Sequence, residues 1–371
     1  MRFVLAISEL SGNGPSGSRL RIAAGLAERG HEVEVLSLTR RCDREIPPSV
    51  RVTRLPGAPS VYPAHYATRL QLALKLRRWF ARENDRKRID FVSSSLTTTD
   101  RIVRMAGIEG AHHWIHIATS QVLADSRSER RRKRRARFFR NLYDGRKVIG
   151  VSQGVVDDLA LLGAVPEQSR IIYNAYDIEA IRSKRADIPS DLPNGPFILH
   201  VGRFAPAKRY DVLFDAYRRS GRPEKLVLLT PPSPELQKMI ADRTSESRVV
   251  VAGFRENPFP FMAAASALIL SSDREGFPNV LPEALICGTP VVSTDCPAGP
   301  SEILTGPYAR WLSRTGDAEA LAKNLKDVLE TPYETAPLVD ERFTLSYALE
   351  GIEEIAASSG APFLGKPRFF V

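Results

Sequence analysis

The chain has 371 residues, of which 43% are hydrophobic and 26% charged, a composition typical of a folded protein with room for two domains. No window approaches 18 uninterrupted apolar residues, and the apolar segment at 2–8 reaches polar residues at once, so we expect neither a membrane-spanning helix nor a signal peptide. The three cysteines (Cys42, Cys287 and Cys296) are too scattered for a disulfide framework or a metal site, which favours a reducing, cytoplasmic setting, and most of the net charge of +10 comes from one basic segment.

The first half of the chain alternates strand and helix patterns. Strands are predicted at residues 2–8, 31–38, 90–94, 114–118, 147–152 and 170–174. Helices are predicted at 18–30, where Gly30 ends the helix, at 67–84 and at 155–163. In the second of these, Leu72, Leu76, Trp79 and Phe80 favour a place in the core over a membrane anchor. The alternation predicts a parallel, doubly wound sheet.

A glycine-rich loop, Gly12-x-Gly14-x-x-Gly17, follows the first strand. It matches the G-x-G-x-x-G pattern of dinucleotide-binding folds, which alone is weak evidence. Pro15 removes a backbone donor where a pyrophosphate needs one, and Arg40-Arg41 stand where NAD binding needs an acidic residue. These arginines leave an NADP-dependent oxidoreductase as an alternative, whereas Ser18 in place of a lysine excludes a P-loop. We interpret the glycines as a place where the backbone approaches a ligand's phosphate or sugar, with a tight turn alone as the second interpretation.

The basic segment at 127–140, RSERRRKRRARFFR, holds nine Lys/Arg and one Glu and accounts for +8 of the net charge. As a solvated helix it would be anchored by Phe138, Phe139, Leu142 and Tyr143. As a binding surface it would direct Arg131, Arg132, Arg134 and Arg135 at anionic lipid head groups. Nucleic acid is the rival partner, but the sequence has no nucleic-acid-binding motif and no aromatic platform within the run.

The strand and helix alternation restarts after a polar, Pro- and Gly-containing linker at 182–196. The second half has five predicted strands, at 197–203, 225–230, 248–253, 266–272 and 289–295. Helices are predicted at 209–220, 235–243, 259–265, 280–288 and 319–330. The sequence thus predicts two doubly wound domains that bind a ligand at the carboxyl ends of their strands.

The most informative segment is residues 271–304. Glu275 lies in a loop after a strand, and Glu283 lies early in a helix for which Asn279 is the expected N-cap and Pro282 is tolerated in the first turn. The free N–H groups of a helix start suit a phosphate, and carboxylates accept the paired hydroxyls of a ribose or sugar. A ligand with both parts is a nucleoside-diphosphate sugar.

Two cations, Arg203 and Lys208, follow another strand of the same domain in the segment VGRFAPAKR. Placed beside a pyrophosphate, they would stabilise the charge that builds up on a departing nucleoside diphosphate. A metal would do the same, but the sequence has no Asp-x-Asp pair to hold one. We therefore expect no metal and no cofactor. His112 and His113 are interpreted as structural residues.

The segments GRFAPAKRYDVL, VAGFRENPFPFMAAASALILSSDREGFPNVLPEAL and CGTPVVSTDC resemble the family 4 (group 1) glycosyltransferases of the GT-B type, and the resemblance extends from residue 1 to about 355. It implies two Rossmann-like α/β domains that face a central cleft. These are an N-terminal acceptor domain at 1–180, completed by a crossover helix at about 341–357, and a C-terminal donor domain at 195–335. It also implies a retaining, metal-independent hexosyltransferase.

The resemblance assigns roles to particular residues. Arg203 and Lys208 would bind the donor diphosphate, Glu283 the ribose and Phe254 the base. Glu275 would bind the donor sugar together with the backbone of Gly276, Phe277, Pro278 and Asn279. His116 would face the transferred sugar as a catalytic group, and Gly14 of the glycine loop would contact the donor. The family's loop often has Glu-Arg after its glycines, whereas this chain has Pro-Ser-Gly-Ser, and its last dozen residues have no counterpart.

The resulting hypothesis is a cytoplasmic glycosyltransferase, peripheral on the inner face of the membrane, that acts in cell-surface polysaccharide, lipopolysaccharide or glycolipid assembly. Its expected partners are a UDP- or GDP-sugar donor, a glycan or lipid-linked acceptor and an anionic membrane, with no nucleic acid. The alternatives are the NADP-dependent oxidoreductase and a basic nucleic-acid-binding protein.

Overall fold

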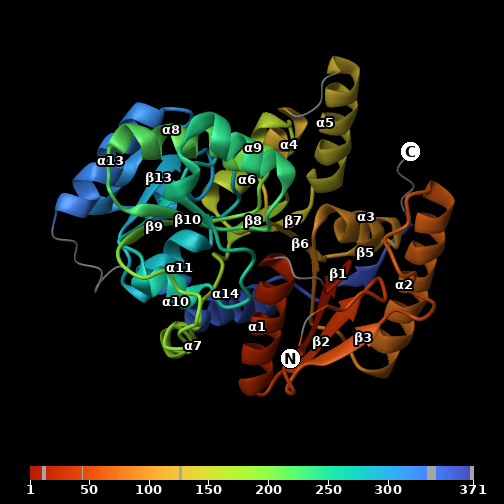
Figure 1. Cartoon of the computed structure of the whole chain (residues 1–371). Coiled ribbons are helices and arrows are strands. Elements are labelled where there is room, and N and C mark those ends of the chain that lie inside the picture. Colours follow the sequence, from red (N-terminus) through yellow and green to blue (C-terminus); the bar gives the residue numbers. More distant parts are fainter. Residues whose placement is uncertain (11–13, 44, 125–127, 332–339, 368–371) are drawn as a thin grey trace. The chain divides into compact units, whose positions relative to one another are not determined.

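The computed structural model describes residues 1–10, 14–43, 45–124, 128–331 and 340–367 (Figure 1). The chain divides into two compact units. Unit 1 comprises Met1–Ala175 and Leu345–Val371, and unit 2 comprises Tyr176–Thr344. Among the residues described, no helix is long and apolar enough to cross a membrane.

Unit 1 is built on a seven-stranded parallel sheet in the order β3-β2-β1-β4-β6-β7-β8. Its strands are β1 (Arg2–Ile7), β2 (Glu32–Ser37), β3 (Arg51–Arg54), β4 (Phe91–Ser95), β6 (His112–Ile115), β7 (Lys147–Gly150) and β8 (Gln168–Ile171). The central strands β1 and β4 are buried along their whole length, as their near-continuous apolar and small residues require in a sheet covered on both faces.

Seven helices pack around this sheet in the described part of unit 1. They are α1 (Gly14–Glu28), α2 (Tyr66–Arg86), α3 (Thr97–Met105), α4 (Thr119–Ala124), α5 (Glu129–Tyr143), α6 (Gln153–Leu161) and α14 (Leu345–Ser358). The prediction that α2 belongs to the core is confirmed, because Leu72, Leu76, Trp79 and Phe80 are buried against β1 and β4.

Unit 2 has a six-stranded parallel sheet in the order β11-β10-β9-β12-β13-β14. Its strands are β9 (Phe197–Val201), β10 (Lys225–Leu229), β11 (Val249–Val251), β12 (Ala267–Leu270), β13 (Val291–Asp295) and β14 (Leu312–Arg314). Its helices are α7 (Ile178–Lys184), α8 (Tyr210–Ser220), α9 (Pro234–Arg243), α10 (Phe259–Ala264), α11 (Val280–Cys287), α12 (Pro300–Ile303) and α13 (Ala318–Glu330). The core lies between the sheet and α8, α9 and α13. Both sheets confirm the predicted α/β, doubly wound parallel architecture.

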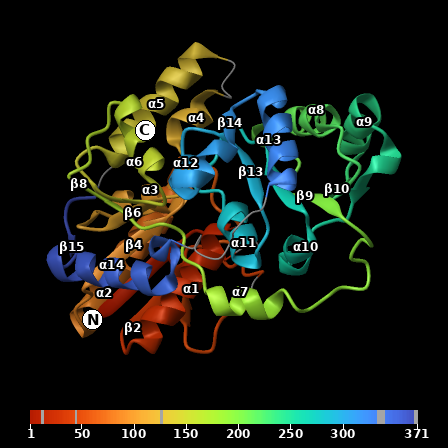
Figure 2. The same ribbon diagram turned by 90° about the vertical axis from the view of Figure 1, so that its left-hand side faces the viewer.

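The last helix, α14, belongs to unit 1, where it packs beside α1 (Figure 2). Glu353 of α14 accepts hydrogen bonds from Arg29 (2.9 Å) and pairs with His31 Nε2 (2.8 Å). A Cβ on Gly25 of α1 would lie 2.7 Å from Leu349 of α14, so the two helices approach closely at this glycine. After α14, β15 (Phe363–Leu364) pairs antiparallel with β5 (Ile108–Glu109), a role the sequence did not predict for the C-terminal residues.

Several predicted boundaries are wrong. Helix α1 begins at Gly14, so Gly17 lies inside the helix and not in a loop, because Pro15 near the helix start already favours helical φ. Strand β6 ends at Ile115, before the predicted 118. The first residues of the expected linker belong to α7, which begins where Asp177 accepts a hydrogen bond from the Ala180 N–H (2.9 Å). Gly12 lies outside the described residues.

Candidate functional site

The carboxyl edge of the unit 2 sheet carries the predicted donor residues. Arg203 follows β9, Phe254 follows β11 and Glu275 follows β12. Since all strands of this sheet are parallel, these three loops emerge at the same edge. Arg203 is exposed, and Phe254 is 65% exposed just beyond Gly253, whose φ of +83° turns the chain out of β11. An aromatic ring exposed to this extent is free to stack on a planar ligand.

Lys208 and Glu275 form an ion pair at this edge. The Lys208 Nζ lies 2.6 Å from Glu275 Oε1, and the two side chains are 23% and 12% exposed. The structure therefore brings together a cation predicted to bind phosphate and a carboxylate predicted to bind a sugar. In a ligand that has both a phosphate and a sugar, the phosphate would pair with the lysine and the sugar hydroxyls would donate hydrogen bonds to the carboxylate.

Lys208 is held by the loop that carries Glu275. It ends a 3₁₀ turn, η1 (Pro206–Lys208), whose carbonyls accept two hydrogen bonds from that loop. Ser271 Oγ donates to the Lys208 carbonyl (2.8 Å) and the Asp273 N–H donates to the Ala207 carbonyl (2.9 Å). These bonds join the β9–α8 and β12–α11 loops into one structure, so the lysine and the carboxylate are positioned together.

Arg209, which the sequence analysis did not single out, strengthens this connection. It has φ +47°, a left-handed conformation that is uncommon for residues other than glycine. Its guanidinium contacts Asp211 (2.8 Å) and Asp273 (2.8 Å). Hydrogen bonds to Asp211 and then to Asp273 raise the pKa of Arg209 above its ordinary value. Its αL backbone and its two ion pairs together set the direction in which the preceding Lys208 leaves the turn.

The segment Gly276–Pro278 follows Glu275, and its side chains pack inside unit 2. All three residues are buried, and the Phe277 ring packs edge-on against Phe343 with 5.4 Å between centroids. A Cβ on Gly299 (φ +100°) would lie 2.5 Å from Pro278 Cδ, so this glycine allows the segment to lie against the next loop. Gly299 is a residue that the sequence analysis missed.

Asn279 is the N-cap residue of α11, as predicted, but its side chain does not cap the helix. Asn279 has helical φ and ψ and makes no side-chain capping bond. Its Oδ1 instead accepts a hydrogen bond from Tyr176 Oη (2.7 Å). The Asn279 carbonyl accepts the first helical bond from the Glu283 N–H (3.1 Å), which places Glu283 in the first turn of α11 as predicted.

The cysteines are free thiols, and two of them are buried. Burial raises the pKa of both Cys287 and Cys296 to about 12, with the nearby Glu275 charge contributing at Cys296. Both thiols are therefore neutral and poorly nucleophilic near pH 7. No group of three His, Cys, Asp or Glu residues with the arrangement of a metal site occurs within the described ranges.

The predicted residues of unit 1 lie near the carboxyl ends of β1 and β6. Gly14 is the first residue of α1, and His116 directly follows β6. The Nε2 atom of His116 is buried and has no hydrogen-bond partner in the described ranges. Burial, and then the charge of Arg19, lower the pKa of His116 well below its ordinary value, so the imidazole is neutral near pH 7.

The other two histidines of β6 are structural, as the sequence analysis interpreted them. His112 stacks on Phe91 with 4.9 Å between ring centroids, and His113 pairs through Nδ1 with Ser94 Oγ (2.8 Å) and Asp100 (3.4 Å). Both are 2% exposed.

The basic segment forms helix α5, which extends beyond the other helices of unit 1 in Figures 1 and 2. Its anchors are those predicted: Phe139, Leu142 and Tyr143 are buried and Phe138 is half-buried. Arg104 of α3 donates a hydrogen bond to the Leu142 carbonyl (2.7 Å) and so fixes the end of α5. Residues 130–135 are all exposed.

Two family models match the chain. The model described as Glycosyltransferase Family 4 matches residues 14–180, and the model described as Glycosyl transferases group 1 matches residues 195–331. The matches fall in turn on the two parallel-sheet units described above. The chain belongs to the group 1, family 4 glycosyltransferases.

Curated relatives act on bacterial glycans. The chain is 33% identical over 183 residues to the N-acetylgalactosamine-N,N'-diacetylbacillosaminyl-diphospho-undecaprenol 4-alpha-N-acetylgalactosaminyltransferase of Campylobacter jejuni, a match that covers 48% of this chain and 49% of the relative. It is 30% identical over 155 residues to the lipopolysaccharide core biosynthesis glycosyltransferase LpsE of Rhizobium meliloti, covering 41% and 44%. The chain spans about half the length of these relatives or less.

Solved structures show that the fold is GT-B. Anabaena Alr3699/HepE in complex with UDP and glucose matches with a TM-score of 0.73 at 18% identity, over 96% of this chain and all of that one. Sucrose-phosphate synthase from Thermosynechococcus elongatus matches with a TM-score of 0.74 at 19% identity, over 96% and 98%.

Proposed function

We propose that this protein transfers a sugar from a nucleoside-diphosphate sugar to a hydroxyl of a glycan or lipid-linked acceptor in the assembly of a cell-surface polysaccharide or lipopolysaccharide. The observation that carries the proposal is the Lys208–Glu275 pair, fixed between two loops at the carboxyl edge of the unit 2 sheet. The names of the Campylobacter and Rhizobium relatives support the acceptor class, and the UDP in the Anabaena structure supports the donor class.

In this proposal unit 2 binds the donor. Arg203 and Lys208 contact the diphosphate and stabilise the negative charge that it gains as it leaves. Glu283 accepts the ribose hydroxyls and Phe254 stacks on the base. Glu275 binds the sugar with the backbone of Gly276–Asn279. Two fixed cations supply the charge compensation for which other enzymes use a metal, so the proposed reaction needs none.

Unit 1 is proposed to bind the acceptor, with Gly14 and His116 near the transferred sugar. We propose retention of configuration by a front-face route. The bond between the anomeric carbon and the phosphate oxygen breaks, the bond to the acceptor oxygen forms on the same face, and the acceptor's hydroxyl proton passes to the leaving phosphate. A neutral His116 suits a contact with the uncharged sugar.

The first test is thermal unfolding in EDTA with UDP, GDP, ADP, CMP, NADH and NADPH. A ligand at about 100 times its dissociation constant stabilises the folded protein by about 2.7 kcal/mol, which is readily measured. We expect one nucleoside diphosphate to raise the unfolding temperature and Lys208→Met to weaken this effect. The exposed Lys238→Met variant, on α9, is the matched control. A response to NADPH alone would contradict the proposal.

We also propose that α5 holds the protein on the inner face of an anionic membrane. Its exposed arginines include Arg131, Arg132, Arg134 and Arg135, and each basic residue near such a surface contributes about 1 kcal/mol. Changing these four to Ser should release the protein from phosphatidylglycerol vesicles, while neutral phosphatidylcholine vesicles should bind neither form. Unchanged retention, or preferential binding of duplex DNA by the wild type, would refute this proposal.

A further inference from the structure

Arg19, on the second turn of α1, is a buried arginine with an unusual environment. Its residue is 1% exposed, and its guanidinium carbon lies 3.3 Å from the centroid of the Trp114 ring. Trp114 is itself buried in β6, two residues before His116. The guanidinium is thus stacked on a rigid aromatic surface in the middle of unit 1. When a guanidinium lies over an aromatic ring, its N–H groups point outward in the guanidinium plane, where they can donate hydrogen bonds to another group.

Very little satisfies these N–H groups. Arg19 Nη2 donates one long hydrogen bond to Ser18 Oγ (3.4 Å), and Nε and Nη1 are buried without a hydrogen-bond partner among the described residues. Within the part of the chain that the structure describes, no carboxylate forms an ion pair with Arg19, and the like charge of Arg21 acts on it. Burial, and then Arg21, lower the pKa of Arg19 well below its ordinary value.

Such an arrangement costs stability. A buried cation is normally paired, and a buried donor without a partner loses its hydrogen bonds to water without replacement. Stacking on Trp114 recovers only part of this cost. The free donors point to a function, because a ligand that brings negative charge and acceptor oxygens would repay the loss when it binds.

The surroundings select the charge and type of this ligand. The carboxyl end of β6 contributes His116, whose buried Nε2 also lacks a partner, and His116 and Ile117 lead to the surface, since Ile117 is 43% exposed. Helix α1 directs the positive end of its dipole toward its own N-terminus, near the turn from which Arg19 projects. All of these features favour an anion with several oxygens.

We propose that Arg19, held flat on Trp114, is the centre of a binding subsite for a phosphate oxyanion. The subsite is formed by residues of unit 1, whereas Arg203 and Lys208 belong to unit 2. Under the proposed function, on which this part of the inference rests, the phosphate belongs either to the donor's diphosphate or to the phosphate link of a lipid-bound acceptor.

The test measures binding by calorimetry to the full chain in EDTA, with inorganic pyrophosphate, UDP and farnesyl diphosphate as probes. Arg19→Met removes the charge and keeps much of the volume, and Arg19→Lys keeps the charge but loses the planar fork. We expect Arg19→Met to weaken the binding of at least one of the diphosphate probes tenfold or more. The affinity of Arg19→Lys should lie between that of Arg19→Met and that of the wild type. Loss confined to UDP assigns the donor, and loss confined to farnesyl diphosphate assigns the acceptor.

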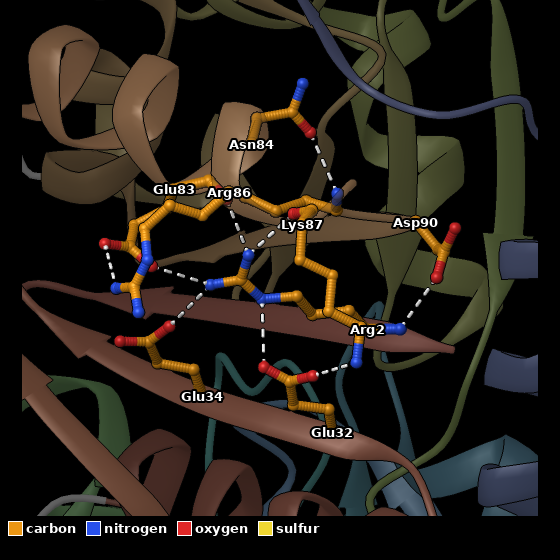
Figure 3. Close-up of polar contacts among 9 residues, drawn as sticks. Arg2, Glu32, Glu34, Glu83, Asn84, Arg86, Lys87 and Asp90 are labelled. Atoms are coloured by element: carbon orange, nitrogen blue, oxygen red, sulfur yellow. Dashed lines mark hydrogen bonds and ion pairs between the residues drawn. The ribbon is translucent and has the colours of Figure 1, made fainter.

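Arg2→Met is the matched control, because Arg2 is a buried arginine of the same unit that forms ion pairs with three carboxylates (Figure 3). It should leave all three affinities unchanged. Two outcomes would overturn the subsite. In the first, both Arg19 variants keep the affinities of the wild type. In the second, Arg19→Met loses as much folding stability as Arg2→Met while Arg19→Lys keeps the affinities of the wild type. If the wild type binds pyrophosphate through Arg19 but binds no nucleoside diphosphate, the subsite stands and the proposed donor fails.

Discussion

Arg2 and Arg19 are both buried in unit 1, at 3% and 1% exposure, but at opposite ends of the sheet. Arg2 begins β1, and its guanidinium lies 3.0 Å from Glu83, 3.3 Å from Glu32 and 3.5 Å from Glu34 (Figure 3). It also donates to the carbonyls of Glu83 (2.8 Å) and Lys87 (2.7 Å). Arg19, beyond the carboxyl end of β1, has one long hydrogen bond to a serine.

The difference in partners between the two arginines suggests different roles, folding stability for Arg2 and ligand binding for Arg19. At the amino end of the sheet the protein surrounds the buried charge of Arg2 with three carboxylates and two carbonyls, and only Nε, 3.3 Å from Glu32, makes no hydrogen bond within the described residues. At the carboxyl end, two nitrogens of the buried Arg19 guanidinium make no hydrogen bond within the described residues, and the proposed ligand would supply the missing acceptors. In open α/β sheets ligands bind outside the carboxyl ends of the strands. The arginine with fewer protein partners, Arg19, is the one that lies at this end.

The largest expected effect is that of Arg2→Met on folding. Removing one partner of a buried ion pair costs about 3–5 kcal/mol, because the carboxylates of Glu34 and Glu83 then remain buried without a cation. Urea denaturation followed by circular dichroism should show this loss. Arg19→Met should lose far less or gain stability, and equal losses in the two variants would remove the distinction drawn above.

Lys208→Met should act on turnover rather than on folding. If Lys208 stabilises the leaving diphosphate, its removal should lower kcat on the order of 10²–10³-fold, as the loss of one preorganised donor does elsewhere. The assay is sugar transfer from the donor identified by the thermal panel, with Lys238→Met as control. A rise in KM with kcat unchanged would mean that Lys208 only binds the donor.

The pH dependence of stability provides a smaller effect from the same strand that carries Trp114. Burial, and then the charge of Lys147, lower the pKa of His112 from its ordinary 6.5 to about 3. The unfolded chain therefore takes up a proton below pH 6.5 that the folded protein does not, and the unfolding free energy falls by about 1.4 kcal/mol per pH unit between pH 6.5 and 3 for this group. In His112→Leu the slope measured by urea denaturation should be shallower by one proton. An unchanged slope would show that His112 is protonated when folded.

The smallest effect concerns Arg209, a half-exposed arginine that has partners but lies at a carboxyl edge. Arg209→Asn keeps a residue that tolerates the left-handed backbone but loses the ion pair with Asp273. Because that pair is partly exposed, we expect a stability change within about 1 kcal/mol. The loss of kcat, expressed as a free energy, should exceed the loss of folding free energy, because Arg209 no longer positions Lys208. Unchanged kcat would show that the β12–α11 loop positions Lys208 without Arg209.

Much of the fold could be predicted because its signals are local. Apolar periodicity located β1, β2, α2 and α13 to within a few residues, and the apolar residues at the end of the basic segment identified the anchors of α5. The short helices α3, α4 and α7 were missed, since a turn or two of helix has too few residues to show a period. Gly17 was placed in a loop because a glycine suggests a break, although tertiary packing overrides that preference.

The candidate site divides in the same way. The order and spacing of Arg203, Lys208, Glu275 and Glu283 could be found from the sequence, because each follows a strand or begins a helix. The hydrogen bonds and ion pairs of the site could not be found from the sequence, because they join residues that are distant in the chain, such as Lys208 with Glu275 and Tyr176 with Asn279. No local pattern records such a pairing.

The sequence by itself determined the family, the alternation of strands and helices, and the chemical types available at the ends of the strands, since these depend on residue identity and spacing along the chain. Only the tertiary structure decided which charges are paired. Within the described residues it placed three carboxylates around Arg2 and none in an ion pair with Arg19, and the free energy of a buried charge depends on what lies around it in space.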